Sequence, residues 1–313
     1  MVDRIATVSA YQSVLTDLQA AETRQAKAQA QISSGKIAND LSGFGNHAQA
    51  LTATQTIKAR VDGMVDQLNQ TGVKMTFQQT ALEQVSSIAQ QVQLQLTNAI
   101  GVGTGDSLMA NLQSLFSQAA DAINTQYNGD YMFAGGQTDT KPFTATTMAD
   151  LTTQPVSNFF QDGTQISTSR VDDATAVQTG FLATNVGKSL MTVFQSIQAF
   201  QQTPAGNFNG PITAAQQAFI DTAMTQISAV VGSTNQTAAE GGNAQNQIST
   251  ALSQQKDRQT TITGVLGDLS NADVATAATN LAQAQAAVQA SAQVFNALKS
   301  MSLLNYLSGN GVA

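Results

Sequence analysis

The sequence predicts a mainly α-helical protein, in which long coiled-coil helices come from both ends of the chain and a small β-rich insert lies in the middle. Two stretches with apolar residues at seven-residue spacing carry this prediction, one in the first half and one at the end of the sequence. Between them, from about residue 136 to 180, the helical period disappears and Thr, Gly, Pro and Asp interrupt the chain.

The clearest heptad predicts a long helix from Asn46 to Ile100 that ends in "GVGTG". Thr71 and Gln78 interrupt its second apolar row. The first row consists of Val61, Leu68, Met75, Leu82, Ala89 and Leu96, and the second contains Met64, Val85, Val92 and Ala99. Because these rows persist over about six heptads, the helix is expected to pack along its whole length.

Further elements follow on either side of the insert. A second helix is expected from Leu108 through Tyr127, stopping near "NGD". In the insert, Asp162-Gly163 between two strand-like runs predicts a β-hairpin. A helical stripe returns at 190–200, and Thr213 with Gln216 predicts a capping box for the next helix, whose pattern weakens through "EGGNAQNQ".

The two ends of the sequence are also predicted to be helical and to pair. Apolar residues at coiled-coil spacing are Val8, Tyr11, Leu15 and Leu18 near the start, and Leu281, Val288, Phe295 and Leu298 near the end. Ala277 and Ala284 belong to the same row as Leu298. The end lacks Asp, Glu, Lys and Arg from Val274 through Leu298. Since one helical partner covers only about a third of a helix surface, neighbouring copies are expected to cover the rest.

Composition excludes several classes of function. A formal net charge of -7 and a pI near 4.5 argue against binding to nucleic acid or anionic lipid. Cysteine is absent, which excludes disulfides, thiolate metal sites and a cysteine nucleophile. No stretch reaches the ~18 apolar residues of a membrane span, so membrane insertion is not expected. The first residues, "MVDRIATVSAYQSVL", lack the features of a cleaved Sec-type signal peptide.

The residues that could carry chemistry do not form a catalytic, cofactor or metal site. The single histidine, His47, has no second histidine or cysteine to complete a usual zinc site. The "VGKS" at 186–189 has Leu182 where a phosphate-binding loop requires glycine. Asp172 and Asp173 stand beside turn residues, where solvated carboxylates are common. The sequence therefore predicts no enzyme and no cofactor.

An aromatic cluster leads to a family resemblance. The stretch "YMFAGGQTDTKPF" resembles the signature of the flagellar hook-associated proteins of the hook–filament junction, members of the flagellin superfamily. Its matching residues are Tyr131, Phe133, Ala134, Gly135, Asp139 and Phe143. The end of the sequence, through "SLLNYL", is similar to the end of that family. "QAQISSGKIANDLSGFG" resembles the segment after the first flagellin helix, although only Asn39 and Asp40 match beyond Ser-Gly-Lys.

The resemblance implies a flagellin-like rod with three layers. Residues 1–40 and 272–313 would form an inner terminal coiled coil, 41–135 and 181–271 a long helical rod, and 136–180 an outer insert. The inner helices would assemble with other copies through Val8, Tyr11, Leu15, Leu18, Leu281, Val288, Phe295, Leu298, Leu303, Leu304, Tyr306 and Leu307.

The resemblance also implies partners and a location. The protein would form a ring of its own copies between the first hook-associated protein and flagellin. A cytoplasmic chaperone and the flagellar type III export apparatus would handle it before it reaches the extracellular flagellum. Three alternatives remain: a flagellin that forms the filament itself, a cytoplasmic coiled-coil signalling protein, and an adhesin that uses the insert. A signalling protein would need a charged, methylatable helical face, which the sequence lacks.

Overall fold

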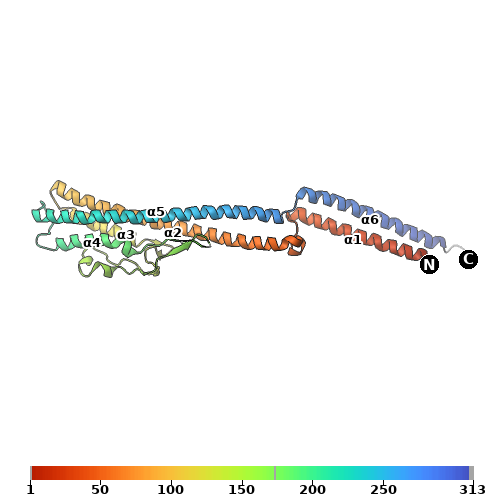
Figure 1. Ribbon diagram of the computed structural model, residues 1–313, viewed down its shortest axis with the longest axis horizontal. Helices are drawn as coiled ribbons and strands as arrows, with labels where there is room; N and C mark the ends of the chain where they lie inside the picture. The colour runs from red at the N-terminus through yellow and green to blue at the C-terminus, as the bar shows by residue number, and fades with distance from the viewer. Residues whose placement is uncertain (1, 173, 310–313) are drawn as a thin grey trace. The chain divides into compact units, whose positions relative to one another are not determined.

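The structure, a computed structural model, describes residues 2–172 and 174–309, with side chains for residues 9, 11–172 and 174–299. It confirms a mainly helical chain with small two-stranded antiparallel sheets (Figure 1). The α-helices are α1 (Val2–Ser34), α2 (Ala48–Val102), α3 (Leu108–Ile123), α4 (Ala183–Gln201), α5 (Ala214–Ser270) and α6 (Val274–Gly309). The strands are β1 (Gln126–Tyr127), β2 (Asp130–Tyr131), β3 (Thr168–Arg170) and β4 (Ala176–Gln178). Short 3₁₀ helices are η1 (Leu41–His47), η2 (Asp150–Thr152) and η3 (Val156–Phe159).

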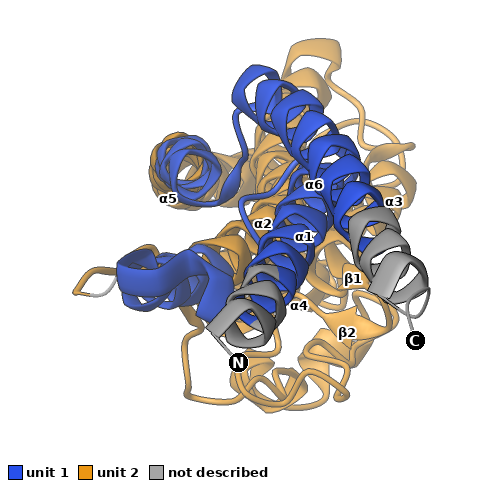
Figure 2. Cartoon of the chain, turned by 90° about the vertical axis from the view of Figure 1, so that its right-hand side faces the viewer, with its two compact units in different colours: residues 1–60, 258–313 blue, residues 61–257 orange. Residues whose placement is uncertain are grey.

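The chain divides into two compact units, each coloured separately in Figure 2. Unit 1 comprises residues 1–60 and 258–313, and it contains α1, η1 and α6. Unit 2 comprises residues 61–257 and contains α3, α4 and all four strands. Helices α2 and α5 contribute to both units.

In unit 2, α2 and α5 run antiparallel and are joined by polar side chains. Gln245 Nε2 donates to Thr76 Oγ1 at 3.1 Å, and Gln93 Nε2 donates to Ser228 Oγ at 2.8 Å. The helix predicted from Asn46 to Ile100 is confirmed as α2, within two residues at each end. Its first heptad row is buried, as expected of a coiled-coil seam.

The two polar interruptions of the α2 heptad hold the insert. Gln78 is buried and its Nε2 donates to Met132 O at 2.9 Å, while Thr71 Oγ1 lies 3.3 Å from Ser169 Oγ. On α5, buried Gln255 similarly donates to Val171 O at 3.1 Å. Gln78 and Gln255 thus donate to backbone carbonyls of the segments that they hold, and Thr71 pairs with the Ser169 hydroxyl.

The core of unit 2 is aromatic where α3, α4 and the insert meet. Phe116 on α3 makes edge contacts with Phe194 on α4 and with Phe143, at centroid distances of 5.6 and 6.2 Å. Phe143 also packs against Phe160 at 4.9 Å. Such pairs add about 0.5–1.5 kcal/mol each beyond the area that they bury. They fix the insert to the helices.

Helix α3 ends at Ile123, before the predicted Tyr127, because the next side chain pairs with the insert. Asn124 Nδ2 donates to Phe143 O and Asn124 Oδ1 accepts from Phe143 N, both at 2.9 Å. Tyr127 instead belongs to β1 and packs on Phe77 at 5.0 Å. Asn128 and Gly129, both with positive φ, form the two-residue turn to β2. Positive φ at both positions is the requirement of a type I′ turn.

The predicted hairpin at Asp162-Gly163 is wrong. Asp162 Oδ1 accepts from Thr184 Oγ1 at 2.6 Å, which joins it to the start of α4, and Gly163 N donates to Ala134 O at 2.9 Å, which joins it to the segment after β2. The hairpin pairs β3 with β4. Asp172 Oδ1 accepts from the Ala174 and Thr175 amides and closes its turn, in agreement with the turn role predicted for this carboxylate.

The predicted capping box at the start of α5 is confirmed. The helical sequence pattern weakens after it, but the helix itself is not interrupted. Thr213 N donates to Gln216 Oε1 at 2.8 Å and Gln216 N donates to Thr213 Oγ1 at 3.3 Å. Helix α5 continues through "EGGNAQNQ" to Ser270. Gly241 is buried there against α2, and a Cβ at that position would lie 2.8 Å from Leu82 Cδ1. Glycine at this position leaves room for the Leu82 side chain of α2 to approach α5 closely.

Candidate assembly surface

The terminal helices α1 and α6 of unit 1 pair antiparallel, as both Figure 1 and Figure 2 show. Tyr11 and Phe295 meet edge to face at 5.6 Å near one end of the pair. At the other end, Ile37 N donates to Ser270 O at 2.8 Å and Ala272 N donates to Gly35 O at 2.9 Å. The pairing of the two ends that the sequence predicts is therefore present.

Alanine forms the centre of this seam. Ala21, Ala28, Ala277 and Ala284 are buried, at 1, 2, 2 and 5% exposure. Such small side chains allow the two helix backbones to lie close together. The same small size means that each buries little apolar surface, since burial stabilises by roughly 25 cal/mol per Å². The two helices thus lie close together, but the burial of their alanine seam contributes little to the stability of the pair.

The larger apolar residues predicted for assembly lie at the edges of the seam. Tyr11, Leu18, Leu281, Val288, Phe295 and Leu298 are half-buried, and Leu15 is 46% exposed. Val8, Leu303, Leu304, Tyr306 and Leu307 have side chains outside the described residues. Within one molecule, therefore, none of the described large side chains in this set is fully covered.

Helix α6 presents an exposed surface without charge. Its residues from Val274 through Leu298 include no acid or base, and most of them are exposed. Val274 and Val294 are 51 and 49% exposed. Packing supplies most of a helix's stability in a protein, and here only the narrow alanine seam of α6 is packed. This surface is suited to contact with further helices.

The start of α6 is defined by Asp273. Thr276 Oγ1 donates to Asp273 Oδ2 at 2.7 Å, and Ala275 N donates to Oδ1 at 2.9 Å. Hydrogen bonds from the Thr276 hydroxyl, then from the Thr276 and Ala275 amides, hold the Asp273 pKa below its ordinary value. The carboxylate is ionised at neutral pH and caps the helix.

The aromatic motif of the sequence lies where α3, the insert and α4 join. Phe133, Ala134 and Phe143 are fully buried, Tyr131 is half-buried in β2, and Asp139 is exposed. Phe133 O accepts from Ala183 N at 2.8 Å and so connects the motif to α4.

Gly135 completes this motif with a left-handed backbone, at φ 63°. A Cβ there would lie 2.8 Å from Gly163 O and 2.9 Å from Gln165 O, closer than such contacts allow. Glycine is thus required twice, by conformation and by the approach of two backbone segments.

The residues that the sequence suggested as possible chemical groups lie in ordinary helical positions. His47 is exposed in η1, directly before α2. Lys188 of "VGKS" lies inside α4, where its carbonyl accepts from Thr192 Oγ1. Over residues 2–172 and 174–309, no cluster of three His, Cys, Asp or Glu residues could hold a metal ion. In the same range, no helix combines the length and apolar content needed to cross a membrane.

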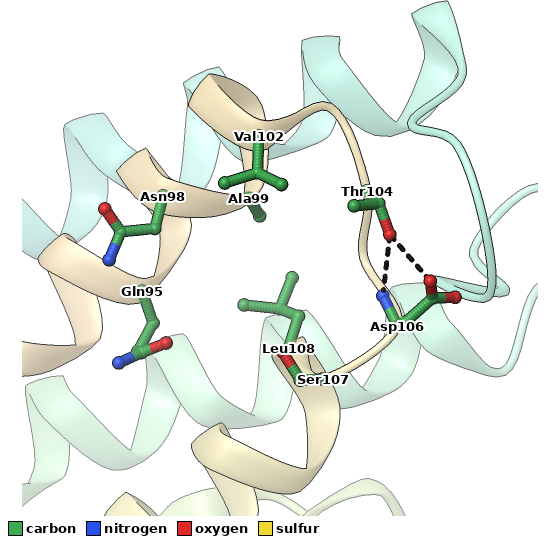
Figure 3. Close-up of a pocket in the computed structure, with 8 residues that line it drawn as sticks. All are labelled: Gln95, Asn98, Ala99, Val102, Thr104, Asp106, Ser107 and Leu108. Carbon is green, nitrogen blue, oxygen red and sulfur yellow. Dashed lines mark hydrogen bonds between the residues drawn. The ribbon is translucent and has the colours of Figure 1, made fainter.

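The pocket in Figure 3, of about 160 Å³, lies between the end of α2 and the start of α3. Asp106 is its one charged residue, and its carboxylate accepts from Thr104 Oγ1 at 2.9 Å and from the Gly210 amide. The lining consists of Gln95, Asn98, Ala99, Val102, Thr104, Asp106, Ser107 and Leu108. Asp106 therefore ties the α2–α3 loop to the loop before α5, and the pocket has the character of a structural junction.

Comparison with known proteins places both ends of the chain in one family. Residues 5–138 match the bacterial flagellin N-terminal helical region, and residues 217–307 match the bacterial flagellin C-terminal helical region. Together the two matches cover more than two thirds of the chain. A comparison with curated protein sequences finds no significant match.

Solved structures share the fold. A structure from Vibrio parahaemolyticus, described as a flagellar hook-associated protein, has a TM-score of 0.57 at 15% identity and covers 73% of this chain and 100% of its own. The FlgL protein of Bacillus cereus has a TM-score of 0.54 at 14% identity and covers 69% of this chain and 99% of its own.

Proposed function

Because this chain belongs to the bacterial flagellin family, whose members are structural rather than enzymatic, we propose that it is the hook–filament junction protein of a flagellum. In this role it connects the hook to the flagellin filament through its terminal helices. The observation that carries the proposal is the incomplete α1–α6 pair, with an alanine seam and a charge-free exposed face on α6.

A junction role explains why the terminal helices are built in this way. Copies arranged in a ring would cover the exposed apolar and amide surface of α6, and burial between copies would add the stability that the alanine seam lacks. A face without charge would also line a central channel without gripping the unfolded polypeptides that pass through it. Stability would then arise mainly upon assembly.

The proposal assigns three layers to the chain. Residues 1–40 and 272–313 form the inner coiled coil, 41–135 and 181–271 form the surrounding helices, and 136–180 face outward. The fully buried Phe133 and Phe143 at the boundary of the insert are consistent with a firm joint between the outer two layers.

The proposal also assigns partners. The ring contacts the first hook-associated protein on the cell side and flagellin on the outer side. Export through the flagellar type III apparatus, with a cytoplasmic chaperone on α6, delivers the chain to the extracellular flagellum. The support is the family membership together with the two similar structures, one of a flagellar hook-associated protein and one of FlgL.

Electron microscopy of cells that lack the protein tests the junction role. The expected result is complete hooks without filaments, with flagellin released into the medium. Normal filaments on these cells would overturn the proposal.

A flagellin that forms the filament itself is the second candidate, because both matched regions are those of flagellins. Purified flagellin grows into long filaments, whereas a junction protein does not. Electron microscopy of the purified chain after seeding with filament fragments separates the two: long filaments made only of this chain would replace the junction role with the filament role.

A further inference from the structure

One flank of the α1–α6 pair carries a basic groove of about 330 Å³. Arg24 and Lys27 of α1 provide its charge. Amide side chains from both helices provide its remaining polar groups, namely Gln31, Asn280 and Gln283. The groove therefore offers two cations and several amide N–H donors to an anionic group, the chemistry that recognises a carboxylate.

The two cations are unfavourably placed within a single molecule. Arg24 and Lys27 are three residues apart on α1, so they are neighbours on one face of the helix, and like charges at this spacing destabilise it. Arg24 Nε donates to Ala20 O at 3.1 Å, and among the described residues neither cation pairs with a carboxylate. Helix α6 supplies no acid between Val274 and Leu298. A carboxylate from outside the molecule would relieve this repulsion.

An exposed acid lies on the opposite flank of the same helix. At 3.6 residues per turn, Glu22 is about 200° around α1 from Arg24 and about 140° from Lys27. Glu22 is exposed, and no described basic residue pairs with it. Exposed Leu15, seven residues earlier, lies on the same stripe as Glu22. One flank of α1 thus carries the groove with Arg24 and Lys27, and the other carries the acidic Glu22 and the apolar Leu15.

We propose that Glu22 of one copy binds the Arg24–Lys27 groove of the next copy, so that unit 1 associates head to tail. This inference rests on the proposed assembly function and specifies its contact. Complementary charges on opposite flanks favour a heterologous interface, which closes into a ring when the rotation between copies permits. A two-fold dimer would instead require one flank that complements itself.

The absence of cysteine allows a direct cross-linking test on intact flagella. The variant Leu15→Cys/Ala20→Cys keeps Glu22, Arg24 and Lys27 and carries one thiol on each flank, at the same five-residue spacing one heptad earlier. A short bismaleimide should link it into a ladder of three or more copies. The matched control is Ser13→Cys/Ala20→Cys, whose thiols are seven residues apart on the basic flank. Its products should stop at dimers, as should those of each single variant.

Charge reversal provides an independent measurement. E22K and the double variant R24E/K27E should each lower the number of filaments per cell several-fold, because each places like charges across the contact. The triple variant E22K/R24E/K27E restores opposite charges and should restore filament number. Circular dichroism of each purified variant serves as the folding control. Because Glu, Lys and Arg have similar helix propensities, the helical content should be unchanged.

The possible outcomes separate this inference from the proposed function. A ladder with Leu15→Cys/Ala20→Cys but not with its control, together with rescue by the triple variant, supports the contact. Dimers alone from intact flagella, or reversal variants with normal filament numbers, would overturn it and leave the junction role in place. Normal filaments in cells that lack the whole protein would overturn both.

Discussion

Replacing Gly135 with alanine should destabilise unit 2 much more than the same change at Gly129. Both glycines have positive φ, 63° and 92°, so alanine at either site meets the steric cost of left-handed backbone, about 1–2 kcal/mol. A Cβ at Gly129 has no atom within 4 Å, whereas at Gly135 it meets two carbonyl oxygens at 2.8 and 2.9 Å. Overpacking of this kind adds roughly 1–3 kcal/mol.

The expected loss of unfolding free energy is therefore about 1–2 kcal/mol for G129A and about 2–5 kcal/mol for G135A. Urea unfolding followed by circular dichroism measures both, provided that the transition of unit 2 is resolved from that of unit 1. Equal losses in the two variants would refute the reasoning that a close approach of backbone segments requires Gly135.

The remaining predictions concern the core and the charges. Phe143→Ala should cost unit 2 about 3–5 kcal/mol in urea unfolding, because the side chain is fully buried among aromatic rings. Leu15→Ala, at a 46% exposed site, should change the stability of the purified chain by less than about 0.5 kcal/mol, and a larger loss would indicate that Leu15 is covered. Hydrogen bonds from the Thr146 and Thr147 amides and the Thr146 hydroxyl lower the Asp150 pKa from 3.8 to about 2. Its stabilisation is thus complete above the unfolded-state pKa and is lost as pH falls through about 2, so Asp150→Ala should be less stable than the parent at pH 7 and equal to it below pH 2. A stability difference that persists below pH 2 would show that Asp150 acts other than through its charge.

The long helices could be predicted from the sequence because their signals are local and repeated. The α2 heptad gave both ends of the helix within two residues. The Thr213–Gln216 capping box also follows directly from residue identity and spacing. Such features depend on neighbours within a few turns, which a sequence records.

The insert was predicted less well because distant partners determine its structure. Asp162-Gly163 has the composition of a turn, but Thr184 and Ala134 bind these residues instead. The two-residue turn is Asn128-Gly129, a strong hairpin signal that was interpreted only as the end of a helix. Likewise, the apolar heptad of α5 is interrupted at "EGGNAQNQ", where Gly241 packs against Leu82 on α2. The local sequence pattern does not reveal this contact.

The assembly surface was predicted in outline and its centre only in part, since the heptad rows included Ala277 and Ala284 of α6 but neither Ala21 nor Ala28 of α1. The heptad rows identified larger side chains such as Leu281 and Val288, which lie half-buried at the edges of the seam. Alanines fill the centre, and alanine gives a weak periodic signal because it is common on all faces of these helices. The basic groove at Arg24 and Lys27 cannot be predicted from a local pattern either, since its amide groups come from both ends of the sequence.

Hydrogen exchange compared between the purified chain and intact flagella tests most directly whether other copies complete the terminal helices. The account predicts weak protection of the amides at 288–298 in the purified chain, and strong protection of the same amides in flagella. Protection in the purified chain that equals the level in flagella would contradict it, because α1 alone would then suffice to stabilise α6.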